Sequence, residues 1–405
     1  MPKKQILIIG GGAAGFFLAA NIPFSKKFSV TILEKSHSPL QKVKISGGGR
    51  CNVTHACFDP NDLIQFYPRG EKELRSIFHK FQPGDTIQWF EDKGVSLKIE
   101  DDNRVFPISN SSQTIIDVLE NEVKKNKVEV CFSTGVNTIK KENGIFIIET
   151  QNKEYIADFL IISSGSSPKM WETIKKLGHT IINPLPSLFT FNIKNKKLNN
   201  LMGISFENVE ISIPKIKLEE QGAVLITHWG ISGPAVLRLS AWGAIDLAQE
   251  KYTFDCFINW IATDDVLALE KLMDCKNSHP KKMVFNYNPF QLTSRFWHFI
   301  LEENDISNTL TFADISKEKL LKINQSLTKM KLEVKGKSTF KDEFVTCGGV
   351  DLKEIDFRSM QSKIHPNLFF AGEVLNIDAI TGGFNFQACW SESFVISEFL
   401  KHSLP

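Results

Sequence analysis

Long apolar runs are missing from this sequence of 405 residues: none approaches the roughly 18 consecutive apolar residues that a membrane span requires. The first apolar run is too short for a signal peptide and leads directly into glycines. A strong net charge is also missing, since 48 Lys and Arg balance 46 Asp and Glu to a formal charge of +2. This balance removes the main electrostatic argument for a nucleic-acid binder. We therefore expect a cytoplasmic protein with no membrane and no nucleic-acid partner, and the sequence leaves its oligomeric state open.

Cysteine is sparse, and its seven positions form no pattern that a disulfide framework or a metal centre would need. The number is odd and the positions are scattered along a chain without an export signal. Only Cys51 and Cys57 lie close together, with His55 between them. A zinc site would need a second Cys or His pair at ligand spacing, and none follows. We expect reduced thiols and no bound metal ion.

What the sequence does contain is a dinucleotide-binding pattern near its first residue. Residues 5–9 are a short apolar run bounded by glycine, which is typical of a buried parallel strand. The run leads into residues 10–15, whose sequence Gly-Gly-Gly-Ala-Ala-Gly is a G-x-G-x-x-G motif, and residues 16–20 continue with helical character. A second apolar run, residues 28–33, ends at Glu34. Strand, glycine turn, helix and acid in this order predict a dinucleotide site.

Each part of this pattern has a physical role at a dinucleotide. Gly10 allows the tight turn, Gly12 lets a pyrophosphate approach the backbone, and Gly15 allows helix and strand to pack closely. The N–H groups at the helix N-terminus bind phosphate, and Glu34 accepts hydrogen bonds from ribose hydroxyls. The residues expected to contact the dinucleotide in this part of the chain are Gly10, Gly12, Ala13, Ala14, Gly15, Glu34 and Lys35.

Two more glycine clusters lie at opposite ends of the sequence. One spans residues 42–54 and contains three consecutive glycines followed by Arg50, and the other spans residues 372–388 and contains Gly382-Gly383. Consecutive glycines leave the backbone bare, so that a flat ring or a pyrophosphate can lie against it. Arg50 supplies a bidentate donor for phosphate, and Lys44 supplies a point charge. The first motif does not distinguish FAD from NAD, but no second G-x-G-x-x-G follows a strand, which argues against separate FAD and NAD(P)H modules.

At these blocks the chain resembles the aminoacetone-oxidase-like or BaiN-like NAD(P)/FAD-dependent oxidoreductases, over essentially its whole length. The resemblance rests on the first motif and on four further blocks, which are residues 46–54 (SGGGRCNVT), 104–107 (RVFP), 227–234 (THWGISGP) and 372–387 (GEVLNIDAITGGFNFQ). The chain departs from the family pattern at His55, where Asn is usual, and at Asn376, where Asp is usual. It departs again at Glu392-Ser393, where Ser-Gly is usual.

The resemblance implies an α/β fold, in which a discontinuous Rossmann-like FAD-binding domain carries an inserted β-rich domain with a small helical part. We expect residues 1–189 and 345–405 to form the FAD-binding domain and residues 190–344 to form the insertion. Pro184 and Pro186 mark the first boundary, because proline breaks regular structure.

The spacing of apolar residues adds a coarse secondary-structure map that does not depend on the resemblance. We expect strands over residues 128–132, 144–149 and 160–165, alternating strands over 189–216, and helices over 115–124, 266–273, 317–327 and 384–396. The strand over 160–165 ends in small residues, and in flavoproteins of this type such a strand end lies under the dinucleotide.

The two distant glycine clusters should meet at one isoalloxazine ring. The helix over residues 384–396 would begin just after Gly382-Gly383 and direct its positive end at the pyrimidine edge of the flavin. Asn385 and Gln387 are natural amide partners for that edge, and Glu373 or Asp378 would bind the ribityl chain. The resemblance adds Val136, whose backbone would contact the adenine. The further residues expected at the cofactor are Lys44, Ser46, Gly48, Gly49, Arg50, Cys51, Asn52, Val136, Ser164, Gly165, Gly372, Glu373, Asp378, Gly382, Gly383, Asn385, Phe386 and Gln387.

The expected function is that of an FAD-dependent oxidoreductase acting on an unidentified small molecule. NAD(P)H or the substrate would reduce the flavin, and a second substrate or oxygen would reoxidise it. His228, in a Gly-, Ser- and Pro-rich turn, is the candidate acid–base group, and with Trp229 it should face the flavin across a cleft. Two alternatives stay open. One is a flavin-dependent RNA-modifying or redox-sensing protein with a macromolecular partner, and the other is a dinucleotide-binding protein without turnover.

Overall fold

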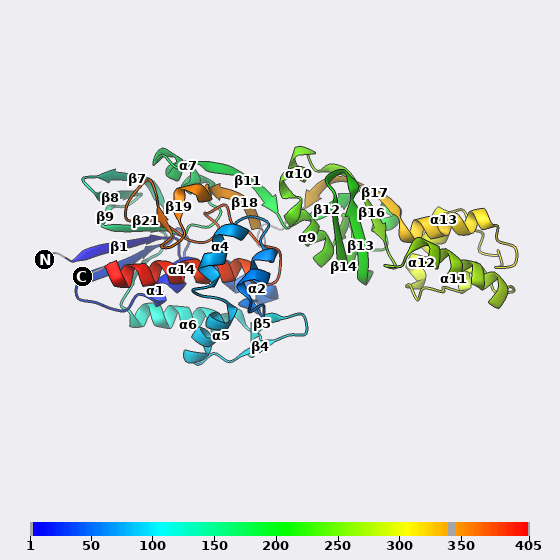
Figure 1. Ribbon diagram of the computed structural model, residues 1–405, viewed down its shortest axis with the longest axis horizontal. Helices are drawn as coiled ribbons and strands as arrows, with labels where there is room; N and C mark the ends of the chain where they lie inside the picture. The colour runs from blue at the N-terminus through cyan, green and yellow to red at the C-terminus, as the bar shows by residue number, and fades with distance from the viewer. Residues whose placement is uncertain (1–2, 339–344, 404–405) are drawn as a thin grey trace. The chain divides into compact units, whose positions relative to one another are not determined.

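The computed structural model describes residues 3–338 and 345–403, and the chain divides into two compact units (Figure 1). The first unit contains the residues up to Ser187 together with the C-terminal part of the chain, and the second unit begins at Leu188. The first expected boundary, after residue 189, lies two residues beyond the observed one. The second expected boundary, after residue 344, lies outside the described residues.

The first unit is built on a seven-stranded sheet. Its strands are, in spatial order, β19 (Ile355–Asp356), β20 (Gln361–Ser362), β21 (Leu368–Phe370), β10 (Phe159–Ile162), β1 (Lys4–Ile9), β2 (Phe28–Leu33) and β6 (Glu129–Cys131). The five strands from β21 to β6 pair in parallel. The last four residues of β1 and the last three of β10 are all buried, which is the pattern of parallel strands covered on both faces. The carboxyl ends of these central strands therefore lie together at one edge of the sheet.

Three smaller sheets complete the first unit. They are β7 (Val136–Glu142), β8 (Ile145–Thr150) and β9 (Glu154–Ala157); β3 (Thr54–His55), β5 (Arg104–Pro107) and β4 (Leu97–Ile99); and β11 (Ile181–Ser187) with β18 (Val345–Val350). The predicted strands over 128–132, 144–149 and 160–165 correspond to β6, β8 and β10. Pro184 and Pro186 do not end regular structure as expected, because β11 continues through them. A register shift between Ile182 and Leu185 accommodates the prolines in the pairing with β18.

Helices surround these sheets. They are α1 (Ala13–Ala20), α2 (Gln41–Gly49), α3 (Pro60–Leu63), α4 (Glu71–Phe78), α5 (Pro83–Asp92), α6 (Ser112–Lys125), α7 (Pro168–Lys176) and α14 (Phe384–Ser403), with the 3-10 turns η1 (Ile64–Phe66) and η4 (Leu352–Glu354). α6 begins where the Ser111 side chain accepts the Gln113 N–H, and its buried face repeats at helical spacing through Ile115, Leu119 and Val123. α1 packs against both α6 and α14, so the two ends of the chain meet in this unit.

The second unit is a closed barrel with attached helices. The barrel strands are, in spatial order, β12 (Thr190–Ile193), β15 (Gly230–Ser232), β14 (Leu218–Thr227), β13 (Ser205–Ile213), β16 (Thr253–Asn259) and β17 (Met330–Ser338). The helices are α8 (Lys196–Asn199), α9 (Pro234–Trp242), α10 (Ala244–Gln249), α11 (Asp265–Ser278), α12 (Ser294–Glu303) and α13 (Lys317–Thr328), with η2 (Pro214–Ile216) and η3 (Val284–Asn286). α11, α12 and α13 gather into the small helical part (Figure 1).

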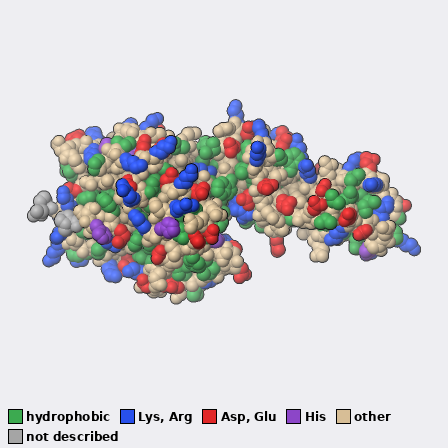
Figure 2. Space-filling model, viewed as in Figure 1, with side chains coloured by type: hydrophobic (Ala, Val, Ile, Leu, Met, Phe, Trp, Pro, Cys, Tyr) green, Lys and Arg blue, Asp and Glu red, His purple; other side chains and the backbone are tan. Residues whose placement is uncertain are grey.

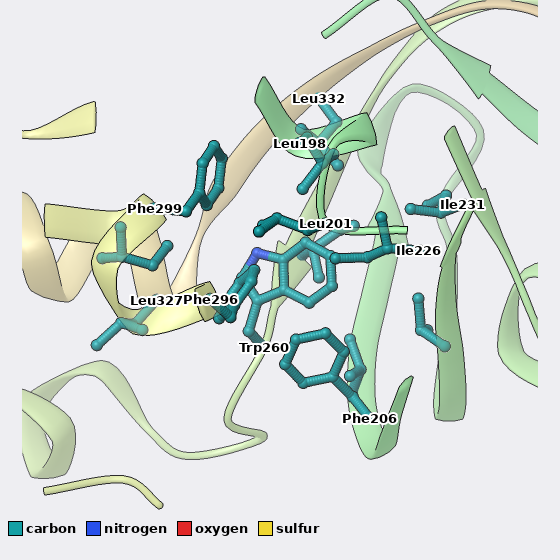
Figure 3. Packing of buried hydrophobic residues seen from close by; sticks show 14 of the residues in the cluster. Leu198, Leu201, Phe206, Ile226, Ile231, Trp260, Phe296, Phe299, Leu327 and Leu332 are labelled. Carbon is teal, nitrogen blue, oxygen red and sulfur yellow. The ribbon is translucent and has the colours of Figure 1, made fainter. Parts of the chain in front are cut away.

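One hydrophobic core joins the barrel to the helical part of the second unit (Figure 3). Trp260 packs between Phe206 of β13 and Phe296 of α12, at ring-centroid distances of 4.8 and 4.9 Å. All three side chains are buried. Because barrel and helices share these rings, the helical part belongs to the β-rich unit, as the α/β fold with a mixed insertion predicts. Among the described residues, no helix combines the length and apolar content that a bilayer span needs.

Candidate cofactor site

The turn between β1 and α1 shows which of its glycines the protein itself requires. A Cβ on Gly10, where φ is +111°, would lie 2.4 Å from the Ser163 carbonyl oxygen, and a Cβ on Gly15 would lie 2.1 Å from the Gly10 oxygen. A Cβ on Gly12 would meet no atom within 4 Å, and the backbone there is extended. The first and third glycines are therefore needed for packing, whereas the second borders open space. A pyrophosphate fits this space, since the N–H groups of the α1 N-terminus lie beside it.

Glu34 lies at the carboxyl end of β2 and is buried, as a ribose-binding acid should be. Its two carboxylate oxygens accept the Gly11 and Ser36 N–H groups, each at 2.7 Å. A carboxylate has about four acceptor positions, so further capacity is left for hydroxyl groups. The exposed Lys35 lies next to Gly135, and the Thr134 N–H donates to the Glu34 carbonyl at 2.8 Å. The segment that leads to Val136 therefore lies against this end of the site.

The carboxyl end of β10 is a third part of the candidate cofactor site, next to the glycine turn and Glu34. The Ser163 hydroxyl donates to the Ile9 and Gly10 carbonyls at 3.2 Å, which fastens β10 to the glycine turn. The Ser164 hydroxyl is buried without a partner, and a Cβ on Gly165 would lie 3.8 Å from a Glu373 carboxylate oxygen. The end of β10 thus connects the first glycine motif to the Gly372–Glu373 turn.

The middle glycine cluster bends the chain instead of continuing α2. Ser46 has an extended ψ of 148°, and Gly47 and Gly48 have positive φ values of +57° and +67°. A Cβ on Gly48 or Gly49 would meet no atom within 4 Å, so this backbone is bare, as expected. Lys44 is exposed on α2 just before the bend. The bend therefore presents an open peptide surface that can receive part of a cofactor.

Arg50, directly after these glycines, already has two partners in the protein. Its guanidinium lies 3.9 Å above the Phe106 ring centroid, and its Nη1 donates to a Glu100 carboxylate oxygen at 2.7 Å. Arg50 lowers the pKa of Glu100 from its ordinary value through this hydrogen bond. The bidentate phosphate contact expected for Arg50 would have to compete with Glu100, and it stays a prediction.

The expectation that the two distant glycine clusters meet is confirmed. A Cβ on Gly383, where φ is +93°, would lie 2.6 Å from the Thr54 carbonyl and 2.9 Å from Asn52 Oδ1. Asn52 Oδ1, Ser164 Oγ and His55 Nδ1 are buried atoms without a hydrogen-bond partner. Buried polar atoms are ordinarily satisfied, so three such atoms beside the glycine clusters fit a polar cofactor bound between them.

Four of the residues predicted to contact the cofactor are buried or hydrogen-bonded within the protein. Gln387 is fully buried, and its amide is used by Thr54, Thr86 and Ser391. Asp378 is also fully buried, and its carboxylate accepts hydrogen bonds from Arg69 and Ser187. The third residue is Asn385, whose side-chain oxygen accepts the Ala379 N–H and whose side-chain NH2 group donates to the Ala379 carbonyl. The fourth is Cys51, which is fully buried. The polar side-chain atoms of Gln387, Asp378 and Asn385 thus have partners within the protein, and the contacts of all four residues with FAD stay predictions.

Burial raises the pKa of Cys51 to about 12, which favours the protonated thiol over the reactive thiolate. Phe386 is half-buried and stacks on Trp390 with centroids 5.6 Å apart. Gly382, where φ is +137°, and Glu373 are half-buried, Gly372 is buried, and Glu373 is paired with Lys42. Among the described residues, no three His, Cys, Asp or Glu side chains gather to hold a metal ion.

His55 is the residue that sequence reasoning did not assign to this site. Its ring stacks on Phe384 at 4.5 Å, and a Cβ on Gly382 would lie 3.5 Å from its Cδ2. Burial lowers the pKa of His55, while the nearby Asp102 opposes this effect. The imidazole is therefore mostly neutral at pH 7, with one nitrogen protonated. The departure from the family pattern at this position was the signal that could have identified it.

His228 lies in the second unit, in the turn between β14 and β15, where it is exposed. Its ring contacts Trp229 at a centroid distance of 4.4 Å, and the Trp229 indole donates to Thr190 Oγ1 at 3.0 Å. That His228 and Trp229 face the flavin stays a prediction.

Together these features define a Rossmann-type FAD-dependent oxidoreductase. Residues 4–398 match the family described as HI0933-like protein Rossmann domain, and the chain belongs to this family. The family resemblance, the α/β fold and FAD as cofactor are therefore confirmed.

Three relatives are similar to the chain over nearly the full length of both partners. The ribosomal RNA dihydrouridine synthase of Escherichia coli (strain K12) is 25% identical, with 99% of this chain and 98% of the relative covered. That of Haemophilus influenzae is 26% identical, with 96% and 97% covered. A 3-dehydro-bile acid delta(4,6)-reductase from Clostridium scindens is 23% identical, with 97% and 98% covered.

Proposed function

We propose that this protein is an FAD-dependent reductase that saturates a carbon–carbon double bond conjugated with a carbonyl group, and that a uridine of ribosomal RNA is its substrate. The full-length similarity to proteins named for two such reductions carries the proposal. Forming dihydrouridine saturates a ring double bond that is conjugated with a carbonyl. A delta(4,6)-reductase acting on a 3-dehydro bile acid saturates double bonds conjugated with a ketone. Both reactions add a hydride and a proton to the same kind of electron-poor alkene.

The chain supplies the surroundings for this chemistry. When bound, FAD carries the two electrons from NAD(P)H to the alkene. α14 begins at Phe384 directly after Gly382-Gly383, so the positive end of this helix lies at the glycine cluster. A helix N-terminus stabilises negative charge, which favours a reduced, anionic cofactor there.

The second need of the reaction is a proton for the alkene carbon that does not receive the hydride. His55 is a titratable side chain beside Gly382, and its neutral ring keeps one N–H. Its stacking on Phe384 fixes the plane of the imidazole. We assign His55 the delivery or relay of this proton.

An RNA substrate also needs basic side chains near the site. Lys42 and Lys44 on α2 are exposed, and Arg50 follows on the same segment. On the face shown in Figure 2, Lys and Arg side chains lie over the first unit, interspersed with Asp and Glu. This mixed surface fits recognition of one exposed nucleotide better than a long backbone track.

A small cyclic enone is the second candidate substrate, in keeping with the small-molecule expectation. The bile acid relative and the formal net charge of +2 favour it. The two candidates share the reaction and differ only in the substrate, so one assay separates them.

The test is anaerobic incubation of the purified protein with NADPH or NADH and ribosomal RNA that lacks dihydrouridine. We expect nucleoside mass spectrometry to show uridine gaining two hydrogen atoms at one site. Gly12→Val is the matched control, because a Cβ at this position meets no protein atom within 4 Å and the added side chain would occupy the expected cofactor space. Saturation of an enone with unchanged RNA would identify a small-molecule reductase. Flavin reduction without saturation of either substrate would overturn the proposal.

A further inference from the structure

Glu392 is a buried carboxylate that the chemistry above does not use. It lies on α14 with no exposed surface, and its Oε2 accepts the Gly372 N–H at 2.5 Å. Its Oε1 is buried and has no hydrogen-bond partner. Burying an acid with only one hydrogen-bonded oxygen costs folding free energy. The presence of Glu392 at a position where the family pattern has serine therefore needs a reason.

The contacts of Glu392 lead to the cofactor site from behind. Gly372 has a φ of +79°, and a Cβ there would lie 3.4 Å from the Ala14 Cβ and 3.3 Å from Cys389 Sγ. Gly372 therefore lies against the glycine motif of α1 on one side. The next residue of α14, Ser393, donates from its hydroxyl to the Ala14 carbonyl at 2.9 Å. Glu392 and Ser393 thus fasten α14 to the Gly372 turn and to the Ala14 backbone of α1.

The electrostatic surroundings of Glu392 favour its neutral form. Burial raises the pKa of Glu392 to about 8, and the Gly372 N–H offsets only part of this rise. Its negative charge would also raise the pKa of the neighbouring Tyr67 and Cys389. Glu373 lies on the same turn as Gly372 but is paired with Lys42. No cation among the described residues stabilises the Glu392 carboxylate.

The other elements packed against α14 do not change this balance. α1, α4, α5 and β3 contact α14, and α1 carries no titratable side chain. The titratable side chains on the remaining three are Glu71, Lys72, Glu73, Arg75, Asp85, Glu91, Asp92 and His55, and none of them contributes to the pKa of Glu392.

We propose that Glu392 is a positioning residue for FAD: its Oε2 holds the Gly372 turn by accepting the Gly372 N–H, and ionisation of the acid weakens FAD binding. The diphosphate of FAD is anionic, so a charged carboxylate behind Gly372 and Ala14 repels it through a medium of low dielectric constant. FAD binding and protonation of Glu392 consequently favour each other. The proposal rests on FAD binding alone and is independent of the substrate.

The test is the dissociation constant of FAD, measured on the apoprotein by flavin fluorescence between pH 6 and pH 9.5. We expect the wild-type constant to be flat at low pH and then to rise by up to about tenfold per pH unit, since one proton is linked. Glu392→Gln keeps an oxygen for the Gly372 N–H and does not ionise, so its constant should stay low and flat. Glu398→Gln is the matched control, because Glu398 is on the same helix but its side chain is partly exposed and paired with Lys401. It should behave as wild type.

A second measurement does not depend on the folding of a variant. Calorimetry of FAD binding at pH 8.5, in buffers of different ionisation enthalpy, counts the protons taken up. We expect the wild-type protein to take up a fraction of a proton, and no proton uptake by it would overturn the proposal. A wild-type affinity that is independent of pH, or the same pH dependence in Glu392→Gln, would overturn the proposal.

Discussion

Gly383 lies directly against Thr54, and a Cβ on Gly383 would come within 2.6 Å of the Thr54 carbonyl. These residues belong to glycine clusters that are far apart in the sequence. Because a Cβ at Gly383 would collide with the Thr54 carbonyl, only a glycine lets the two segments touch. Trp390 adds to the same junction by donating from its indole to the Val53 carbonyl at 2.9 Å. The last helix of the chain is therefore part of the cofactor site, although it is far from the N-terminal motif in sequence.

The glycines of the first motif should respond differently to substitution. Gly12→Val is expected to abolish FAD binding and leave the unfolding midpoint of the apoprotein unchanged, because no protein atom lies within 4 Å of its Cβ. Gly15→Ala is expected to destabilise the fold itself, since its Cβ would lie 2.1 Å from the Gly10 oxygen. Flavin absorbance and thermal unfolding measure the two effects. Tight FAD binding by Gly12→Val would mean that the pyrophosphate lies elsewhere.

Glu34→Ala should weaken FAD binding by about ten- to a hundredfold, because a hydrogen bond to a charged group contributes roughly 1.5–3 kcal/mol. The variant also leaves the Gly11 and Ser36 N–H groups without an acceptor, because both donate to the Glu34 carboxylate in the wild-type protein. Glu34→Gln is the control for this loosening of the turn, because it keeps one acceptor and loses the charge. Its FAD affinity should fall between those of wild type and Glu34→Ala, as flavin fluorescence titration can show. Equal affinity in all three proteins would contradict a ribose contact.

His55→Asn should slow substrate reduction by about a hundredfold, at the lower end of what general acid catalysis contributes. FAD affinity and the rate of flavin reduction by NAD(P)H should not change, because neither step needs the proton that His55 supplies. Stopped-flow measurement of the two half-reactions separates these outcomes. His228→Ala, made in parallel, tests the competing assignment. If only His228→Ala slows reoxidation by the substrate, the proton comes from the second unit.

Glu392→Gln should also change the dependence of folding stability on pH. The folded-state pKa of Glu392 is raised from 4.5 to about 8, so the unfolded chain releases this proton first as pH rises. The stability that the neutral acid contributes is complete below pH 4.5 and is lost as pH rises to about 8. The wild-type apoprotein should thus lose on the order of 4 kcal/mol across this window relative to Glu392→Gln. Urea unfolding at pH 5, 6.5 and 8 measures the difference, and parallel curves for the two proteins would contradict it.

Local patterns predicted much of the first unit correctly. β1, the glycine turn and α1 follow from short-range rules, because an apolar run, a tight turn and a helix start depend on neighbouring residues. The helix α6, and α11 and α13 in the second unit, were predicted from apolar spacing for the same reason. The bare backbone at Gly48 and Gly49 also follows from the local sequence, because consecutive glycines carry no side chains. Pro184 and Pro186 misled the prediction, since pairing with β18 and a register shift outweighed the local preference of proline.

The roles of individual polar side chains were decided only by the tertiary structure. Gln387 and Asp378 are polar residues in a cofactor block, yet both are satisfied by distant partners such as Thr86 and Arg69. His55 came next to Gly382 only through the pairing of β3 with β5 and the packing of α14. The sequence by itself determined the fold class, the family and FAD as the cofactor, because these depend on contiguous motifs. Which polar atoms remain unpartnered at the cofactor depends on contacts between segments far apart in the chain, and only the folded structure decides those.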